Sequence, residues 1–595
     1  MGLFLATTAL TEFWDEEQDI LCLGSWCLPY NRRAQSNGFR YSLMPSPWDD
    51  RSSFYRATQY LDAYAEYLLE DLIDHLNKMH GTQHGKKYWR ILLGPWLIHS
   101  LHSTYDRYVH LRWAFEHYGD LQTLVLDPTS FRVPQNTKDV ILSVCDDQSN
   151  LQLFSLLLQG MGCHFPSRPF AGSRPNSKEG STSGLKRIFA RGVRRVLESF
   201  IRRRFGRDYV ALFDLNCPLP ILLTIGKSSG FRIVPCEAPD DQDLGISAPV
   251  FDKSRENFTS LPSRNEFEKL FVQTLPYAFP VQFLEGYGQA TEALRKKLKN
   301  PPRVILSAVN WYWNEAFKFF AAEASERGSR LVAAQHGGGY GVYRYSAFEL
   351  HESRVADRFM VWGWEDSAEP LRQSLPNPTL SIVKDSHPGS FPAQVTSAIL
   401  YLPTEHPRYL ARFQSTPVGT QWEDYYQWIG RFLGSLSSEL RASLRVRHNN
   451  SLINFGQATK ERIVDLYPSI GWDPIGNIHE SLVTSRLAVI DHHATVLLEA
   501  LTINVPTLLF WDPQRWEVRG EAQPYFDELR RAGILWDSPE AAAAKLASVY
   551  DDPWAWWGSE PVQEVRRRFI GHYALGCPDW MTQWTMALQK EMAVR

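Results

Sequence analysis

The chain has 595 residues, too many for one hydrophobic core, so we expect two or three domains. Its composition, 44% hydrophobic and 22% charged, is that of a soluble globular protein, and a net charge of -3 gives no reason to expect a nucleic-acid partner. Seven cysteines without metal-ligand spacing favour a reducing compartment, and no apolar run reaches the roughly 18 residues of a membrane span. The start of the chain lacks the basic segment of a signal peptide, so we expect a cytoplasmic protein.

The first 366 residues alternate short apolar runs with helical patterns. The predicted strands are 3–7, 19–23, 121–126, 209–215, 231–235, 303–308, 330–334 and 359–362, and the longest predicted helices are 52–79 and 88–117. Strands that alternate with helices form parallel sheets covered on both faces. The sequence therefore predicts an α/β fold, with a first Rossmann-like domain at 1–366.

One insertion, 167–208, interrupts this alternation. Its first part, 167–183, is rich in Gly, Ser and Pro and predicts a mobile loop. The segment 185–205 then carries apolar residues on one helical face and arginines and lysines on the other. A basic amphipathic helix suits an anionic membrane surface. The alternative is a solvated helix that packs on the protein's own core.

The strand at 330–334 runs into a glycine-rich turn, Gln335-His336-Gly337-Gly338-Gly339-Tyr340-Gly341. Glycines let backbone N–H groups approach a ligand closely. A histidine beside them can donate to a phosphate or act as a general base. The spacing is neither that of the dinucleotide fingerprint nor that of a P-loop. The alternative is a tight turn with a structural histidine.

Residues 367–396 are rich in Pro and Ser without periodicity, and we interpret them as a linker. The alternation of strands and helices resumes at 397 and continues to 550, which predicts a second Rossmann-like domain. Residues 551–595 form an aromatic-rich helical tail that could cross back to the first domain.

The stretch 485–511 is the strongest single pattern in this second domain. It follows the order strand, turn, helix, strand, which is typical of a parallel βαβ unit. Ligands bind beyond the carboxyl ends of such strands. There the sequence places His492, His493 and Thr495, at a helix N-terminus that suits a phosphate. Glu499, one turn later, could reach a sugar hydroxyl. The local pattern fits a Rossmann-like unit without a ligand equally well.

Charged residues also follow two other strands of this domain. Arg445 and His448 lie in and after the strand at 444–447, and Glu517 and Arg519 follow the strand at 507–511. We expect all four at the same sheet end as the His492 turn. Arginine there suits a bidentate phosphate contact, and the alternative for Arg445 is a surface ion pair.

Several stretches resemble the transferases encoded in bacterial lipopolysaccharide O-antigen clusters. They are TALTEFW with DILCLGSWC near the start, QHGGGYG, and the long run that begins SRLAVIDHHATVLLEALTINVPTLLFWDPQRWEVRG. The resemblance implies a GT-B glycosyltransferase, with two Rossmann-like domains facing across a cleft. An acceptor, either a saccharide or lipid-linked, would bind 1–366, and a nucleotide-sugar donor would bind 397–550. The enzyme would act in the cytoplasm or at the inner face of the plasma membrane, without a bound metal or other cofactor.

This resemblance also suggests individual roles. His336 is the expected base, and Glu12 is the second candidate if the 8–14 turn reaches the cleft. Glu499 would hold the ribose. The donor phosphates would be bound by Arg445, His448, His492, Thr495 and Arg519, with His493, Glu517 and the backbone of Gly337, Gly338 and Gly339 beside them.

Other interpretations stay open. The D-x-D tripeptide at 241–243 is interpreted as a solvated acidic loop, although the sequence does not exclude a metal there. A polyol-phosphate transferase of the CDP-glycerol type would have the same fold. A non-catalytic nucleotide-binding scaffold is the remaining class.

Overall fold

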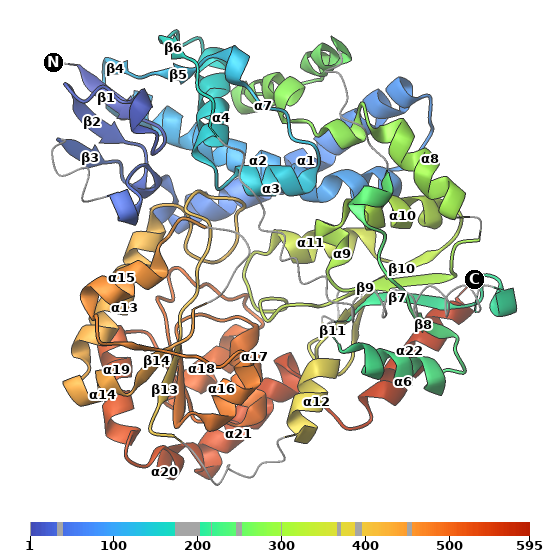
Figure 1. Cartoon of the computed structure of the whole chain (residues 1–595), viewed down its shortest axis with the longest axis vertical. Helices are drawn as coiled ribbons and strands as arrows, with labels where there is room; N and C mark the ends of the chain where they lie inside the picture. Colours follow the sequence, from blue (N-terminus) through green and yellow to red (C-terminus); the bar gives the residue numbers. More distant parts are fainter. Residues whose placement is uncertain are drawn as a thin grey trace.

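The computed structural model describes residues 2–32, 40–172, 201, 203–215, 217–244, 253–298, 300–365, 371–386, 396–448 and 455–594. Within these ranges the chain forms three parallel sheets and a separate strand pair, β5 (Val125–Leu126) with β6 (Ser167–Arg168). Figure 1 shows the three sheets with helices packed around them. The predicted α/β class with two Rossmann-like domains is confirmed, and a smaller third sheet is added to it.

The smaller sheet is built by the first 122 residues, in the order β3-β2-β1-β4. Two long helices follow its first strands, α1 (Arg51–His80) and α2 (Lys86–His117). The carboxylate of Asp50 caps α1 by accepting from the N–H groups of Ser52 and Ser53, at 3.0 and 3.3 Å. The strands are β1 (Leu3–Ala6), β2 (Asp19–Cys22), β3 (Tyr41–Leu43) and β4 (Leu121–Gln122).

The middle sheet has six parallel strands in the order β12-β11-β10-β9-β7-β8. Its helices include α6 (Leu219–Ser228), α10 (Glu315–Glu326) and α11 (Ala347–Val355). The His336 turn leaves the sheet at the carboxyl end of β10. The strands are β7 (Val210–Asp214), β8 (Ile233–Pro235), β9 (Val304–Ser307), β10 (Arg330–Ala334), β11 (Arg358–Val361) and β12 (Arg372–Ser374).

The C-terminal sheet has the order β15-β14-β13-β16-β17-β18, again all parallel. Counted within the domain this is the doubly wound order 3-2-1-4-5-6, so the order reverses between β13 and β16. Both of these strands are buried along their whole length, as sheets covered on two faces require. The strands are β13 (Ile399–Leu402), β14 (Leu444–Val446), β15 (Gly471–Trp472), β16 (Leu487–Ile490), β17 (Thr507–Phe510) and β18 (Leu535–Trp536).

Helices of the C-terminal sheet pack in pairs. α13 (Gln421–Ser435) contacts α19 (Pro539–Val549), and α16 (Ile478–Thr484) contacts α17 (Thr495–Ile503). The remaining helices of this domain are α14 (Ser438–Ala442), α15 (Thr459–Leu466) and α18 (Gln523–Arg531). The predicted βαβ stretch at 485–511 is thus β16, α17 and β17.

The tail returns to the middle sheet. After α20 (Pro553–Trp557) and α21 (Glu560–Tyr573), α22 (Trp580–Ala593) packs beside α6 (Figure 1). Trp580 and Trp584 of α22 belong to the same buried cluster as Val210 and Leu306 of the middle sheet. Glu591 pairs with Arg358 at 3.0 Å and also with Arg330. The tail therefore connects the two larger sheets.

The structure differs from the predicted boundaries in two places. The described part of 367–396, expected as a linker, supplies the edge strand β12 and the helix α12 (Pro378–Ser386). A three-residue polar edge strand, Arg-Gln-Ser, carries no apolar period that a sequence could show. Residues 167 and 168, expected in a mobile loop, pair as β6 with β5.

Most of the basic segment 185–205 lies outside the described residues. Of it, the structure places Ile201 and residues 203–205. No helix in the described ranges is both long enough and apolar enough to cross a membrane.

Candidate functional site

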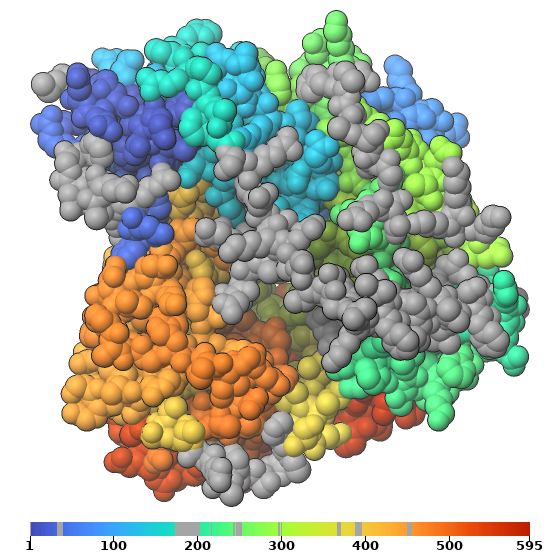
Figure 2. Space-filling view, in the orientation of Figure 1, coloured from blue at the N-terminus to red at the C-terminus, as the bar shows by residue number. Residues whose placement is uncertain are grey.

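The glycine turn of the middle sheet touches the start of α17 in the C-terminal domain. The backbone N–H of Gly338 donates to the Thr495 hydroxyl at 3.1 Å. A Cβ at position 338 would lie 2.6 Å from the carbonyl carbon of Ala494, so only glycine allows this approach. Two predicted site segments, 157 residues apart in sequence, therefore meet. Figure 2 shows a recess between the orange C-terminal domain and the green and yellow parts of the middle domain.

His336 lies in a buried polar group beside this contact. Its Nε2 is 3.1 Å from the Tyr340 hydroxyl, which donates to Glu352 Oε2 at 2.9 Å. Burial lowers the pKa of His336 to about 4 and raises the pKa of Glu352 well above its usual range. The imidazole is therefore neutral at pH 7 and has an unprotonated nitrogen, as a general base requires. Its side chain retains 16% exposure.

Asp491 and His492 follow β16 at the point where the strand order reverses. The Asp491 carboxylate accepts from the hydroxyls of Tyr401 and Tyr425, at 2.6 and 3.0 Å. Its other oxygen lies 3.1 Å from His492 Nδ1. The carboxylate therefore orients the His492 ring, which is itself buried.

His493 packs among aromatic rings. The ring centroids of Tyr343, Trp511, Trp516 and Phe526 lie 4.6 to 5.8 Å from that of His493. Burial, aided by the neighbouring His492, lowers the pKa of His493 to about 3. Tyr343 also donates its hydroxyl to the His493 carbonyl at 3.1 Å. The ring therefore packs against Tyr343 of the middle domain and against three aromatic side chains of its own domain, and the ligand contact of His493 stays a prediction.

Thr495 and Glu499 both lie on α17, as predicted. No side chain caps the start of this helix at Ala494, and the backbone nitrogen of Thr495 would lie 2.8 Å from a Cβ at position 338, so the N-terminus lies beside the glycine turn. Glu499 Oε1 lies 3.2 Å from His479 Nε2, and both side chains keep partial exposure. A carboxylate here is accessible to a ligand hydroxyl.

Glu517 and Arg519 join the two domains. Their segment forms an antiparallel bridge, Tyr343 with Val518. Arg519 Nη2 donates to Glu349 Oε2 at 2.8 Å, so its charge is already offset by a carboxylate of α11. The predicted phosphate contact of Arg519 competes with that ion pair.

The Glu517 carboxylate also accepts hydrogen bonds from the first residues of α1. Arg51 of α1 donates through Nε at 2.8 Å, and the Tyr55 hydroxyl donates to the same oxygen. Arg344 adds a longer contact of 3.4 Å. Glu517 therefore ties the C-terminal domain to α1, a role that its sequence position alone does not reveal.

Arg445 and His448 separate in space. Arg445 Nη1 donates to the carbonyls of Ala442 and Leu444, at 3.0 and 2.7 Å. Its guanidinium thus turns to the amino end of β14, away from the site, because a mid-strand side chain can lean along the strand in either direction. His448 stays at the carboxyl end, where its Nε2 lies 2.8 Å from Glu405 Oε2.

Glu12 lies on an exposed single turn, Thr11–Phe13, after β1. Its backbone carbonyl accepts from Arg168, and Phe13 packs on Phe170 at 5.8 Å between ring centroids. The Glu12 side chain is exposed, and its role as a base in the cleft stays a prediction.

A family model extends over residues 3–588 of the chain, and its description is LIC12162 family transferase. That match covers nearly the whole sequence. The chain belongs to the LIC12162 family of transferases.

No curated protein sequence matches this family member. Solved structures with some similarity are S. aureus MnaA with UDP, WaaG, a glycosyltransferase involved in lipopolysaccharide biosynthesis, and UDP-glucose: anthocyanidin 3-O-glucosyltransferase in complex with UDP. Their sequence identities are 10%, 12% and 11%, and their TM-scores are 0.35, 0.27 and 0.31. The alignments cover 64%, 68% and 65% of this chain and 96%, 95% and 99% of the others.

The loop 403–420 of this transferase was not predicted to belong to the site. The loop leaves β13 at the reversal of strand order and runs across to the first unit, where Arg408 pairs with Asp147 at 2.9 Å. His406 stacks on Trp422, with 5.1 Å between ring centroids, and burial lowers the pKa of His406 to about 3. The available signal was topological: this loop follows the domain's first strand, beside the His492 turn.

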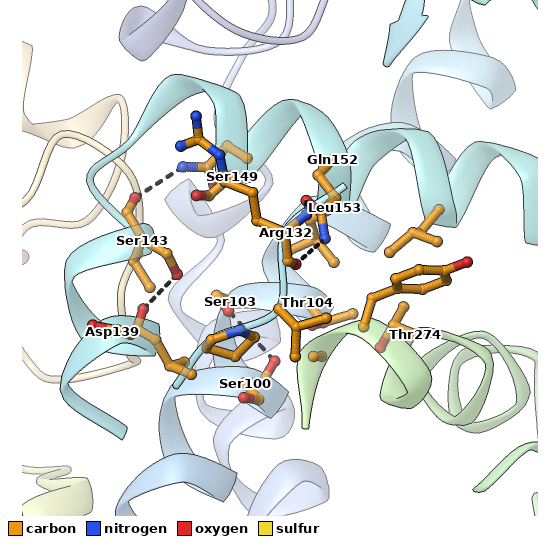
Figure 3. Close-up of a pocket in the computed structure, with 18 of the residues that line it drawn as sticks. Ser100, Ser103, Thr104, Arg132, Asp139, Ser143, Ser149, Gln152, Leu153 and Thr274 are labelled. Atoms are coloured by element: carbon orange, nitrogen blue, oxygen red, sulfur yellow. Dashed lines mark hydrogen bonds between the residues drawn. The ribbon is translucent and has the colours of Figure 1, made fainter. Parts of the chain in front are cut away.

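A pocket of about 160 Å³ lies elsewhere, between α2, α3 (Thr137–Ser143), α4 (Asp147–Gly160) and α7 (Glu266–Ala278). Figure 3 shows Ser100 and Thr104 of α2 beside it. On α2 the neighbouring residues His99 and His102 instead contact the loop at Ala411 and Phe413, both at 3.1 Å. Helix α2 therefore separates this pocket from the cleft.

Proposed function

We propose that this family member is a glycosyltransferase that moves a sugar from a nucleotide-sugar donor to an acceptor hydroxyl. The observation that carries the proposal is the contact of Gly338 with Thr495. It brings His336, a neutral histidine, beside a helix N-terminus at the ligand-binding end of a doubly wound sheet. A base and a phosphate site in contact are what sugar transfer from a nucleotide requires.

The C-terminal domain, 397–550, holds the donor. Glu499 binds the ribose hydroxyls, and the start of α17 with His492 and His448 faces the phosphates. The acceptor lies against 1–366, where His336 takes the proton of its hydroxyl. The acceptor oxygen then bonds to the anomeric carbon as the bond from that carbon to the phosphate oxygen breaks. Helix N–H groups and protein cations stabilise the leaving nucleotide without a metal.

The acceptor is a saccharide or a lipid-linked saccharide of bacterial surface-polysaccharide (O-antigen) assembly. Support comes from the family and from the sequence resemblance stated above. The enzyme works in the cytoplasm, at the inner face of the plasma membrane where lipid-linked acceptors are exposed. The basic segment 185–205 is the proposed membrane contact.

Incubation with UDP-, GDP-, dTDP-, CDP- and CMP-linked donors and a lipid-linked acceptor extract tests the proposal. The expected result is a glycosylated acceptor and one free nucleotide in equal amounts. Release of CMP with transfer of a polyol phosphate would replace the proposal with a polyol-phosphate transferase. Binding without turnover of any donor would leave a nucleotide-binding scaffold.

A further inference from the structure

Arg412, in the loop 403–420, has no carboxylate partner among the residues that the structure describes. Nε and Nη2 of Arg412 both donate to Gln414 Oε1, at 3.1 and 2.9 Å. The guanidinium lies over the Phe348 ring of α11, 3.8 Å from its centroid. Among the described residues no carboxylate lies within ion-pair distance of it. The side chain is partly buried between the two larger domains.

Three arginines near this contact between the domains differ in this respect. An acid within 3.0 Å neutralises each of them: Asp147 pairs with Arg408, Asp424 with Arg515 and Glu349 with Arg519. Removing a guanidinium from water without a counter-charge has a substantial free-energy cost. Compared with these three arginines, Arg412 has no internal acid in the described part of the chain and is therefore placed to receive an external anion.

The groups that surround Arg412 do not supply a negative charge. Its electrostatic neighbours are the phenols of Tyr312, Tyr343 and Tyr340. Burial raises the pKa of all three, that of Tyr343 to about 12, so they stay neutral at pH 7. Arg412 in turn acts on His406, whose pKa is already lowered by burial. The positive charge of Arg412 thus faces the neutral hydroxyls of three tyrosines and the neutral imidazole of His406, which can donate or accept hydrogen bonds.

The position of Arg412 in the topology agrees with a ligand role. Its loop follows β13 at the strand-order reversal, where doubly wound sheets bind ligands. Tyr343, one of its electrostatic neighbours, donates to the His493 carbonyl just before α17. Tyr340, another, is the residue that contacts His336. The guanidinium therefore lies near residues that contact His336 in the middle domain and His493 in the C-terminal domain.

We propose that Arg412 binds a substrate oxyanion, a phosphate or a carboxylate, in the cleft between the two larger domains. Gln414 fixes the guanidinium plane, and Phe348 supports its face, so the free edge is set for a bidentate contact. This inference rests on the proposed function for the identity of the substrate, but not for the anion site itself.

Titration of the whole protein with inorganic pyrophosphate, UDP and glucuronate tests the site, with Kd measured by calorimetry and melting temperature by fluorimetry. The variants are Arg412→Gln and Arg412→Lys. The matched control is Arg431→Gln on α13, which removes the same charge from an exposed ion pair with Glu540 of α19. Binding of pyrophosphate or UDP would identify the oxyanion as a phosphate, and binding of glucuronate would identify it as a carboxylate.

We expect at least one probe to bind the wild type and Arg431→Gln, with Kd raised about 10- to 100-fold in Arg412→Gln. Arg412→Lys should recover part of this loss. Without a probe, Arg412→Gln should melt no lower than the wild type, because it removes an uncompensated charge. Equal affinity in Arg412→Gln, or no binding of any probe to the wild type at millimolar concentrations, would overturn the inference.

The Arg412 anion site and the proposed glycosyltransferase function can be contradicted independently of each other. Sugar transfer at an unchanged rate in Arg412→Gln would leave the proposed function standing and remove the anion site. If pyrophosphate bound in an Arg412-dependent way but no nucleotide sugar were turned over, the anion site would stand and the proposed function would be removed. An Arg412→Gln protein that did not fold would contradict the expected stability, and Arg412→Lys would then decide the affinity.

Discussion

The backbone N–H of Gly338 reaches the Thr495 hydroxyl at 3.1 Å, and this hydrogen bond joins the middle domain to the C-terminal domain. The approach depends on the missing side chain, because a Cβ at 338 would lie 2.8 Å from the Thr495 nitrogen. The turn with His336, the proposed base, supplies the donor of this hydrogen bond. The start of α17, the proposed phosphate site, supplies the acceptor.

Gly338→Ala should therefore disturb the contact between domains while each sheet stays intact. We expect a loss of about 1–3 kcal/mol in unfolding free energy, the usual cost of overpacking, together with a lower kcat. Gly337→Ala is the control, since its Cβ would lie 3.6 Å from the Tyr340 ring, an ordinary contact distance. Chemical denaturation and turnover assays measure both variants. If Gly338→Ala and Gly337→Ala had the same stability and the same kcat, the close approach at position 338 would not matter.

Local sequence patterns predicted the parts of the site that depend on neighbouring residues. The run at 485–511 gave β16, α17 and β17, because four-residue apolar strands and a helical stripe are visible in sequence. The glycines of 337–339 likewise indicated a close backbone approach. The βαβ unit and the glycine turn can each be recognised from the residues of a single segment. The structure places both of them where the two domains meet.

Partners across the fold were not predictable in this way. Arg519 meets Glu349, which is 170 residues earlier, and no local pattern marks that pair. Arg445 lies in mid-strand, where a side chain can lean in either direction, and its guanidinium turns to the amino end of β14. Arg412 was missed because its significance is the absence of an acid around it, which only the three-dimensional structure reveals.

Glu499→Ala should weaken nucleotide binding by about 1–3 kcal/mol, the scale for losing a charged hydrogen-bond partner. The carboxylate is partly exposed on α17 and contacts His479 at 3.2 Å. Glu480→Ala serves as the control, because Glu480 is an exposed carboxylate on the adjacent helix α16. Calorimetric titration with the nucleotide that the donor screen selects gives the affinity. An unchanged Kd in Glu499→Ala would exclude the residue from the site.

Vesicle binding should depend on anionic lipid and decrease with salt, because the basic segment 185–205 would act through surface charge. Co-sedimentation with vesicles of phosphatidylglycerol, compared with phosphatidylcholine alone, measures this dependence. Replacement of four arginines in the segment, 191, 194, 195 and 202, by glutamine should abolish the difference between the two vesicle types. Equal binding to neutral vesicles, or no binding to either type, would contradict an electrostatic contact.

His493 should contribute to the pH dependence of stability. Its pKa is lowered to about 3 in the folded protein, below the ordinary histidine value of 6.5. The unfolded chain therefore binds the extra proton between about pH 6.5 and pH 3, and the stabilisation present above pH 6.5 is lost as pH falls through this window. His493→Phe should reduce the slope of unfolding free energy there by up to about 1.4 kcal/mol per pH unit. Urea denaturation at several pH values measures it, and an unchanged slope would contradict the assignment.

His336 should act as the general base of the reaction. Its alanine variant should lower kcat by roughly 10²–10⁴-fold, the usual contribution of a positioned base, with donor affinity nearly unchanged. Activity of a base rises with pH through its pKa, so the ascending limb of kcat/KM should lie near pH 4, where burial sets the pKa of His336, and not near 6.5.

The limb should disappear in His336→Ala. His117→Ala is the control, because His117 is an exposed histidine at the end of α2, far along the chain from the cleft loops. Kinetics and binding on the same preparation separate the possible roles. Loss of donor affinity with the limb retained would make His336 a phosphate contact. A variant that matches the wild type in both measurements would show that the imidazole serves only the packing with Tyr340 and Glu352.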